Sequence, residues 1–296
     1  MGPGNAVGLY KKGGLNVLTK VSIYTPRLNI PQLLLAGDIA YFDPVQIRGV
    51  TGLNPVKATV NSTQYGSIDG EIPQGNFLGK RNIVLTLGLN PNWADQSMSS
   101  LRDLVYMYFM SKQSVTLRFF SDNKPPCNIA GIVESCEPNI FSKDPEIQVS
   151  IICHQPDFID VSPTIIEGVV GDGSSLTDIE YAGSMPAGFV LEIQSSAAVP
   201  SYTGSILVSN QTPTPQTMTF FTTVDTTQWV RIGTVHGHKF IQSINLLTGV
   251  VTNLLKLLPS ESDWITLEPG PNSFGVIGES SGLVWTLTYY NRHGGL

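Results

Sequence analysis

Apolar and polar side chains alternate with a period of two along many short stretches of this chain, the pattern of half-buried β-strands. Residues 80–89 give the clearest example, with Ile83, Leu85 and Leu87 on one face. Other stretches of the first half with strand character are residues 15–25, 39–41, 46–50, 58–63, 67–72, 114–120, 128–136 and 146–153. Gly66 and the pair Asp69-Gly70 supply turn signals. The first half is therefore predicted to be mainly β.

One segment has the period of an amphipathic helix instead. Its apolar residues recur at the spacing of a single helix face: Leu101, Leu104, Val105, Tyr108 and Phe109. Ser100 and Asp103, three positions apart, are expected to form the N-terminal capping pair. Because a helix among strands usually buries its apolar face, we expect it to cover a sheet in an α+β module. The alternative is that this face binds another subunit.

Strand-like runs continue in the second half, spaced roughly ten residues apart and with no amphipathic helix between them. They span residues 189–193, 204–208, 216–221, 227–232, 239–244, 264–267, 273–277 and 283–289. This spacing predicts a β-sandwich or a jelly roll. Pro156 and Pro163 bracket a change of composition ahead of these runs, so we expect two domains, residues 1–160 and 161–296.

The distribution of charge restricts the partners. The 296 residues carry a formal net charge of −6, and all of the excess acid lies after Asp160. Nucleic-acid binding needs Lys and Arg to neutralise phosphates, so a chain without a basic run is a poor candidate for it. The apolar stretches fall short of the ~20 residues of a membrane span, and no polybasic anchor is present. We expect no membrane partner.

The cysteines and the amino-terminal residues bear on the compartment. Cys127, Cys136 and Cys153 include no CxxC pair, and such an odd, sparse set is typical of a reduced cytosolic protein. Lys11 and Lys12 are followed by an interrupted apolar segment rather than by the continuous core of a signal peptide. The chain is expected to be made and used without export, unless lysis releases it.

Few residues have the spacing of a metal site or a nucleophile. His236 and His238 could place two imidazoles on one strand face, but a zinc ion needs further ligands, and no partner is evident. Cys153 and His154 are adjacent in a predicted strand and so point to opposite faces, which prevents a thiolate–base dyad. We expect a buried thiol and structural or exposed histidines.

Carboxylate pairs make no stronger case for catalysis. Asp69 with Glu71, or Glu134 with Glu137, would serve as a glycosidase pair only if a cleft held them at the right separation. Surface acids are common, and the sequence contains no nucleophile elbow, zinc-protease motif, P-loop or dinucleotide-binding motif. The prediction is a protein that is not an enzyme, with no catalytic residue, no cofactor and no metal.

Tryptophan is the residue type that leaves a binding role open. Trp229 and Trp285 are candidates for stacking on a glycan, because an exposed indole offers a flat apolar face to a sugar ring. A sandwich core also needs aromatic side chains, and the alternation around Trp285 favours burial in the core, the alternative we prefer. Trp264 lies in the same half. Trp93 precedes the helix and is expected to anchor that loop.

Three passages carry a more specific pattern. The first combines residues 69–71 with 78–87, and the second runs from the helix through residues 115–119, 129–135, 137–153 and 156–158. The third comprises residues 263–274 and 289–296. Together these passages resemble the distal tail proteins of long-tailed bacteriophages, the Dit-like tail-tip and baseplate hub family. Residues 163–186 lie outside the likeness.

The resemblance implies a ring-forming, tail-tube-like domain in residues 1–160 and a β-sandwich of galectin or carbohydrate-module type in residues 161–296. It implies a homo-hexameric ring that joins the tail tube protein to the hub and the fibre-bearing tip. The tape-measure protein and DNA would pass through its lumen. The chain would then be a structural virion protein of the viral tail tip, assembled in the host cytoplasm, with a role in host attachment and with host glycans as a further partner.

Two expectations follow for testing this assignment. DNA must slide through such a ring without sticking, so we expect a neutral or acidic lumen. The rival interpretation is a soluble carbohydrate-binding module or a glycan-active accessory protein, in which the second domain does the work. Ring particles would support the first interpretation, and a monomer that binds polysaccharide would support the second.

Overall fold

The chain forms two compact units that consist mainly of β-strands. The structure, a computed structural model, describes residues 18–25, 33–36, 44–64, 66, 69–92, 94–122, 124–139, 145–170, 176–195, 201–278 and 283–296. One unit comprises residues 1–53 and 57–155, and the other comprises residues 54–56 and 156–296. The main division falls between residues 155 and 156, a few positions ahead of the boundary expected at residue 160.

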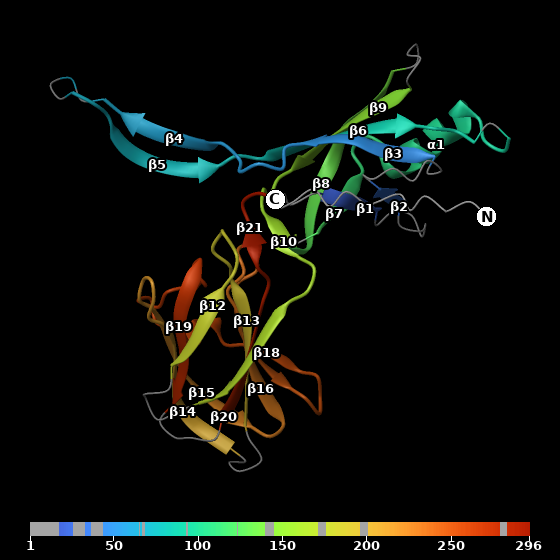
Figure 1. The fold of residues 1–296 in the computed structure, drawn as a ribbon. Helices are drawn as coiled ribbons and strands as arrows, with labels where there is room; N and C mark the ends of the chain where they lie inside the picture. Colours follow the sequence, from blue (N-terminus) through green and yellow to red (C-terminus); the bar gives the residue numbers. More distant parts are fainter. Residues whose placement is uncertain are drawn as a thin grey trace, which may run out of the picture. The chain divides into compact units, whose positions relative to one another are not determined.

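The first unit is built on an antiparallel sheet with the order β2-β1-β7-β8-β9-β6-β3 (Figure 1). Its strands are β1 (Leu18–Tyr24), β2 (Leu33–Ala36), β3 (Val45–Thr51), β6 (Arg81–Leu89), β7 (Ser114–Ser121), β8 (Lys124–Pro138) and β9 (Glu146–Cys153). Alternation puts every second side chain on a buried face, as Ile83 and Leu85 on β6 and Val149 on β9 show. The end strands β2 and β3 lie beside each other, so the sheet curls around its apolar face.

The α-helix α1 (Met98–Tyr108) lies against β6 and buries Leu101, Val105 and Tyr108, which confirms the expected helix on a sheet. Its N-cap is Ser97, whose hydroxyl accepts a hydrogen bond from the Ser100 amide, while the Ser100 hydroxyl accepts one from the Ser97 amide, both at 3.1 Å. The expected capping pair of Ser100 and Asp103 is therefore wrong. Ser97 is the residue with the extended backbone that an N-cap requires.

Between β3 and β6 the chain leaves this sheet as a two-stranded hairpin of β4 (Ala58–Thr63) and β5 (Ile72–Leu78). We call residues 58–78 the arm, and Figure 1 shows the arm extending away from the sheet of its own unit. The sequence pattern places the second strand at residues 67–72; residues 67 and 68 lie outside the described residues, and for residues 69–71 the prediction is wrong. The strand begins at Ile72 because Asp69 and Gly70 belong to the connection between the strands.

The second unit is a β-sandwich. Its hydrogen-bonded path runs β11-β20-β13-β16-β15-β14-β19-β12, with β17 and β18 attached beyond β16. The bounds are β11 (Thr164–Val169), β12 (Thr177–Tyr181), β13 (Phe189–Ser195), β14 (Ser201–Asn210), β15 (Gln216–Asp225), β16 (Gln228–Gly233), β17 (Phe240–Asn245), β18 (Val251–Asn253), β19 (Gly270–Gly278) and β20 (Leu283–Tyr289). β15 and β16 share only the pair Asp225 and Gln228 at their turn. The path therefore separates there into a six-stranded sheet, β11-β20-β13-β16-β17-β18, and a four-stranded sheet, β15-β14-β19-β12.

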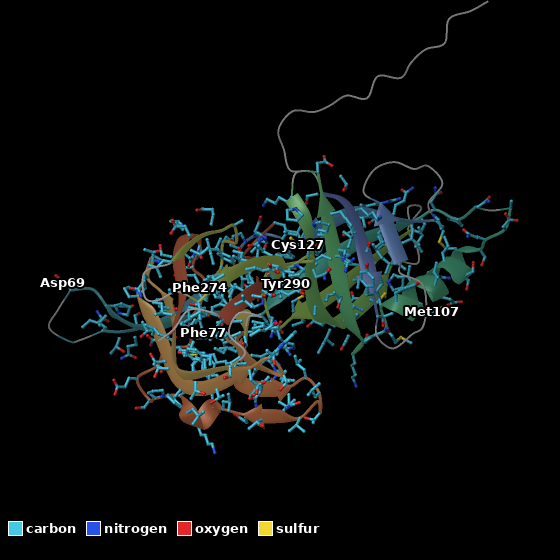
Figure 2. All side chains as sticks on the ribbon, turned by 90° about the horizontal axis from the view of Figure 1, so that it is seen from below. Asp69, Phe77, Met107, Cys127, Phe274 and Tyr290 are labelled. Carbon is cyan, nitrogen blue, oxygen red and sulfur yellow. The ribbon has the colours of Figure 1, made fainter. Side chains whose placement is uncertain are left out.

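Side chains from both sheets form one apolar core. The six-stranded sheet contributes Phe189 and Trp285, and the four-stranded sheet contributes Phe274, which Figure 2 labels among the strands of this unit. The Phe274 ring lies edge-on to both partners, with centroid distances of 5.4 Å to Phe189 and 5.6 Å to Trp285. Such pairs add to the stabilisation that burial alone provides.

Several differences from the sequence prediction concern this unit. Residues 264–267 form no strand, and only a single bridge joins Ala187 to Leu267. The strands β11, β12 and β18 are found where none is expected, and each has a neighbour on one side only. Residues 15–17 and 39–41, and Trp93, lie outside the described residues. No helix in the described part of the chain has the length and hydropathy that a bilayer crossing requires.

Candidate functional site

The arm presents apolar side chains to solvent instead of burying them. Val60 is 63% exposed, Ile72 52%, Phe77 57% and Leu78 41%. Figure 2 labels Phe77 and also Asp69, which lies in the connection between the two strands of the arm. The register pairs Thr59 with Phe77 and Ala58 with Leu78, so the apolar residues are divided between the two faces of the hairpin. Neither face of the arm is covered within its own unit.

The arm is anchored where it joins the sheet, after β3 and before β6. Arg81, at the start of β6, is buried, and its Nη1 donates a hydrogen bond of 2.6 Å to the carbonyl oxygen of Gly52, just after β3. Gly52 has φ +86, and a Cβ there would lie 2.0 Å from the carbonyl oxygen of Asn82. Only glycine meets both conditions without strain. The end of β3 and the start of β6 are thus tied together, while β4 and β5 beyond them are exposed.

The edges of the arm carry little of the usual protection against pairing. Neither β4 nor β5 contains a charged residue. Natural edge strands are usually protected by charges, proline or a covering element, and here Pro73 beside the bulge is the one such residue. An isolated two-stranded hairpin is marginally stable in water. The geometry therefore calls for a partner that pairs with a free edge of the arm or covers its apolar side chains.

The predicted opposition of Cys153 and His154 agrees with their burial. Cys153 is fully buried and His154 is exposed. Burial raises the pKa of the Cys153 thiol to about 11, although the nearby Arg81 guanidinium acts in the opposite direction. Burial, with a smaller effect of the Glu137 carboxylate, also raises the pKa of Cys136 to about 11. Both thiols are therefore protonated near neutral pH and are poor nucleophiles.

The other candidate chemical groups are separated and exposed. His236 and His238 lie in the exposed connection between β16 and β17, with the His238 ring against Phe240. The Glu71 carboxylate accepts a hydrogen bond from Ser62 within the arm, and Asp69 lies in its exposed connection. The Glu134 carboxylate accepts a hydrogen bond of 2.8 Å from Ser150 on an open sheet face. None of these carboxylates lines the shallow hollow on the outer face of the first unit's sheet.

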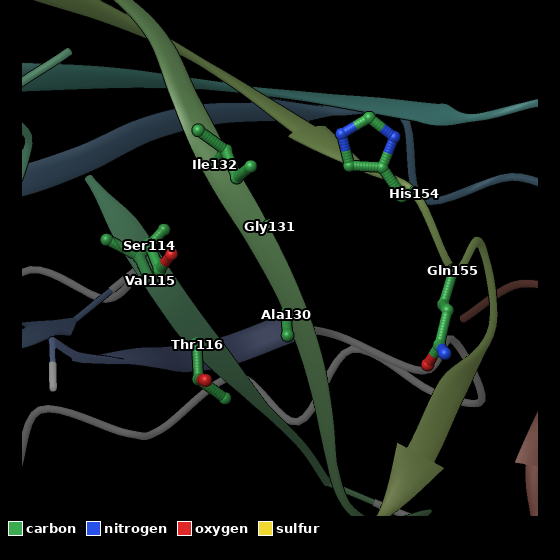
Figure 3. Close-up of a pocket in the computed structure, with 8 residues that line it drawn as sticks. All are labelled: Ser114, Val115, Thr116, Ala130, Gly131, Ile132, His154 and Gln155. Carbon is green, nitrogen blue, oxygen red and sulfur yellow. The ribbon is translucent and has the colours of Figure 1, made fainter. Parts of the chain in front are cut away.

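One shallow hollow lies on the outer face of the first unit's sheet (Figure 3). It has a volume of about 350 Å³ and is lined by Ser114, Val115, Thr116, Ala130, Gly131, Ile132, His154 and Gln155. On β8 the small side chain of Ala130 borders the hollow, whereas a Cβ at Gly131 would instead lie 2.6 Å from the buried Ile151 Cγ2 and 2.9 Å from the Cys153 Sγ. Its lining contains one titratable side chain, His154, and no carboxylate or thiol, so it offers no acid–base pair.

Sequence reasoning missed a charged cluster in the second unit, where β10 (Phe158–Asp160) pairs with β21 (Arg292–His293). The Arg292 Nη2 lies 2.6 Å from the Asp157 Oδ2, and the His293 Nε2 lies 2.9 Å from the Asp160 Oδ1. Both aspartates are nearly fully buried. Because each carboxylate has a partner, the cluster fastens the two ends of this unit together. Residues so far apart along the chain leave no local signal of such a pairing.

Known structures contain the same fold. The Dit protein of phage SPP1, a paradigm of the hub adsorption apparatus in phages that infect Gram-positive bacteria, matches 84% of this chain and 93% of its own, with a TM-score of 0.61 and 14% identity. The fold is that of the SPP1 Dit protein. A chain of the phage P2 baseplate in its activated conformation with Ca matches 91% of this chain and 97% of its own, with a TM-score of 0.43 and 12% identity, too low to add to the argument. No family model and no curated protein sequence matches.

The two candidate tryptophans of this Dit-like fold lie in different environments. Trp285 is 3% exposed and belongs to the sandwich core, the placement that the sequence favours. A ring so deeply buried offers no face to a sugar. Trp229 lies on β16 and is half-buried, so glycan stacking stays a prediction for this residue. Trp264 packs against the core and has the Lys239 ammonium 5.2 Å from its ring centroid.

Proposed function

We propose that this chain is a non-catalytic structural protein of a phage tail tip that assembles into a closed, hexameric ring. The ring joins the tail tube protein to the hub and fibre-bearing tip, and the tape-measure protein and DNA pass through it. Two findings support the proposal: the fold shared with SPP1 Dit, a hub protein, and the resemblance of three sequence passages to distal tail proteins. The protein would be part of the virion, at the tail tip, after assembly in the host cytoplasm.

The arm is the observation that carries the ring assignment. A hairpin that docks on the next copy makes a head-to-tail contact, and such contacts close into a ring when the rotation between copies permits. Strand addition at a free edge supplies main-chain hydrogen bonds, and the exposed apolar side chains supply buried area. The Arg81–Gly52 hydrogen bond joins the chain just after β3 to the start of β6, close to where the arm leaves the sheet.

The assembly state of the purified chain tests this proposal. Multi-angle light scattering and negative-stain imaging are expected to show rings with several times the 32.0 kDa mass of one chain. Phe77→Asp places a charge on the arm and is expected to give monomers, since burying an unpaired carboxylate in an interface costs several kcal/mol, about a thousandfold or more in affinity.

Met107→Asp is the matched control, because Met107 on α1 is 48% exposed, close to the 57% of Phe77, but lies away from the arm (Figure 2). This variant is expected to assemble as the unmodified chain does. A wild-type protein that stays monomeric at high concentration would exclude the ring. Rings formed equally well by Phe77→Asp would exclude the arm as the contact.

A further inference from the structure

The second unit exposes a cluster of aliphatic side chains along one edge of its six-stranded sheet. The cluster begins in the turn between β17 and β18 and continues through β18 to the single helical turn η1 (Leu255–Leu257). The exposed fractions run from 40% for Leu257 to 79% for Leu247. We call this cluster the apolar edge, and its members are Leu246, Leu247, Val250, Val251, Leu255 and Leu257. So many solvent-facing aliphatic residues in so short a segment indicate an interaction surface.

The backbone of the turn in the apolar edge has its amides satisfied from within the unit. The Asn245 Oδ1 accepts hydrogen bonds of 3.0 Å from the amides of both Leu247 and Thr248. The Gly249 amide donates to the Asn245 carbonyl oxygen at 2.8 Å, and the Asn245 amide donates to the Val250 carbonyl oxygen at 2.9 Å. Every amide from residue 246 to residue 250 has an acceptor. Such a turn can therefore enter an apolar medium without leaving N–H groups unpaired.

The charges in this part of the chain are of one sign. Between Asp225 and Glu261 the chain contains no aspartate or glutamate, although the excess acid of the protein lies in this half. The Asp225 carboxylate accepts hydrogen bonds from the amide and the hydroxyl of Thr227. Lys256 lies between two residues of the apolar edge, is exposed, and has no ion-pair partner among the described residues. The apolar edge thus combines aliphatic side chains with a free cation.

From these features we infer that the apolar edge binds the surface of a lipid bilayer that contains anionic headgroups. Leu246, Leu247 and Val250 enter the boundary between the headgroups and the acyl chains. Lys256 lays its methylene stem along the apolar side chains and places its ammonium group among the phosphates. A cation held at an anionic membrane surface adds to the binding that apolar burial provides.

The composition of the apolar edge favours lipid over a protein partner. Protein interfaces are enriched in Tyr, Trp and Arg, and Leu and Val are uncommon among the residues that dominate their binding energy. The apolar edge consists of Leu and Val alone. Fluid acyl chains adapt to protruding aliphatic side chains, whereas a protein would need a matching pocket for each of them.

The expectation of no membrane partner rests on the absence of a long apolar stretch and of a polybasic run. A folded turn that enters only the interface needs neither, because the sheet edge holds its apolar residues together. The net charge of −6 opposes the contact weakly, since at about 0.15 M salt charges more than about 8 Å away are largely screened. The apolar edge lies wholly in the second unit, so the inference does not depend on the proposed ring.

Co-sedimentation of the full-length protein with vesicles tests the inference. The vesicles contain either phosphatidylcholine alone or phosphatidylcholine mixed with phosphatidylglycerol, and the mixed vesicles are expected to bind more tightly. Leu247→Asp is expected to weaken binding to the mixed vesicles about tenfold or more, because burial of one leucine side chain contributes at least that factor. Lys256→Ala is expected to weaken it about fivefold, and only when phosphatidylglycerol is present.

A matched pair of variants separates insertion from a change of net charge. Val250 and Ile165 are both 58% exposed and lie at opposite edges of the same sheet, Ile165 on β11. Val250→Asp and Ile165→Asp add the same charge, but only Val250→Asp is expected to weaken vesicle binding, again about tenfold. Thermal melts show whether each variant is folded.

Three results would overturn the inference: no co-sedimentation with either kind of vesicle, unchanged binding by folded Leu247→Asp, or equal losses in Val250→Asp and Ile165→Asp. A lower mass of Leu247→Asp in light scattering without vesicles would show that a second copy covers the apolar edge, and would overturn it as well. So would a tail protein seen on this edge in images of assembled tips. Ring formation is measured without lipid, so failure of the lipid contact and failure of the ring are distinguishable.

Discussion

Gly52 shows how one residue without a side chain can determine where the arm leaves the sheet. Its positive φ redirects the chain out of β3, and its close approach to the Asn82 carbonyl lets β3 and β6 stay paired at the point where the arm leaves. The buried Arg81 then ties the start of β6 to the end of β3 by donating a hydrogen bond to the Gly52 carbonyl oxygen. The arm can therefore be exposed without loosening the sheet that supports it.

Replacing this glycine should cost stability even though the arm itself buries little. Gly52→Ala is expected to lower the free energy of unfolding by about 2 kcal/mol or more, because it combines a strained backbone with a steric overlap. Urea denaturation followed by circular dichroism measures the change. Gly75→Ala, in β5, is the control: no atom lies within 4 Å of an added Cβ there, so the loss should stay within about 0.5 kcal/mol. Equal losses of unfolding free energy in both variants would contradict the role given to Gly52.

The burial of single residues was predictable where a periodic pattern surrounds them. The period of two correctly placed Cys153 inside and His154 outside, and it favoured the burial of Trp285. The exposure of Phe77 was not predictable, because this residue lies outside the predicted strands and no periodic pattern surrounds it. What exposes it is the departure of the chain at Gly52, and this depends on Asn82, far along the sequence.

At the scale of elements, α1 is held in place by its first turn as well as by its apolar face. The reciprocal hydrogen bonds between Ser97 and Ser100 satisfy two amides that the helix itself leaves unpaired. The sequence offered Ser100 and Asp103 as an equally good pair, since both have the correct spacing. The choice between them depends on where the preceding loop turns, which the spacing does not encode.

The two capping alternatives make different predictions for mutants. Ser97→Ala is expected to destabilise the protein by about 1 kcal/mol, because it removes the side-chain acceptor of the N-cap. Asp103→Ala, at an exposed position inside the helix, is expected to change stability by less than about 0.5 kcal/mol. Thermal or urea unfolding measures both. A larger effect at Asp103 than at Ser97 would contradict the observed cap.

Edge strands were the elements most poorly predicted. No strand was predicted at β11, β12 or β18, and the second strand of the arm was placed several residues too early. Each pairs with one neighbour only, so its pattern is not enforced by burial from two sides. Central strands such as β6, β9 and β20 have burial patterns that alternate regularly, and these were placed almost correctly.

At the scale of the whole molecule, the shared fold with SPP1 Dit agrees with the resemblance noted in the sequence, although identity is only 14%. The fold class followed from periodicity and composition. The proposed contacts between copies did not, because they depend on the direction in which the arm and the free strand edges point. Such directions arise from backbone geometry, as at Gly52, and leave little trace in composition.

The charge of the chain makes a prediction about the proposed lumen. With a net charge of −6 and no basic run, the assembled protein should not retain double-stranded DNA. Electrophoretic mobility shift at a low salt concentration, about 50 mM, is expected to show no complex even when the protein is in large excess. Salt-sensitive binding under these conditions would show that a cationic surface faces the passing DNA, contrary to a neutral or acidic lumen.

The position of β20 has a consequence for the order in which the two units mature during synthesis. This strand lies between β11 and β13, yet it leaves the ribosome after every other strand of the sandwich. The seven strands on the path β2-β1-β7-β8-β9-β6-β3 of the first unit have all been translated much earlier, by the end of β9. A nascent chain would therefore carry those seven strands together with an open sandwich, so premature termination late in the message would leave the sandwich without the strand between β11 and β13.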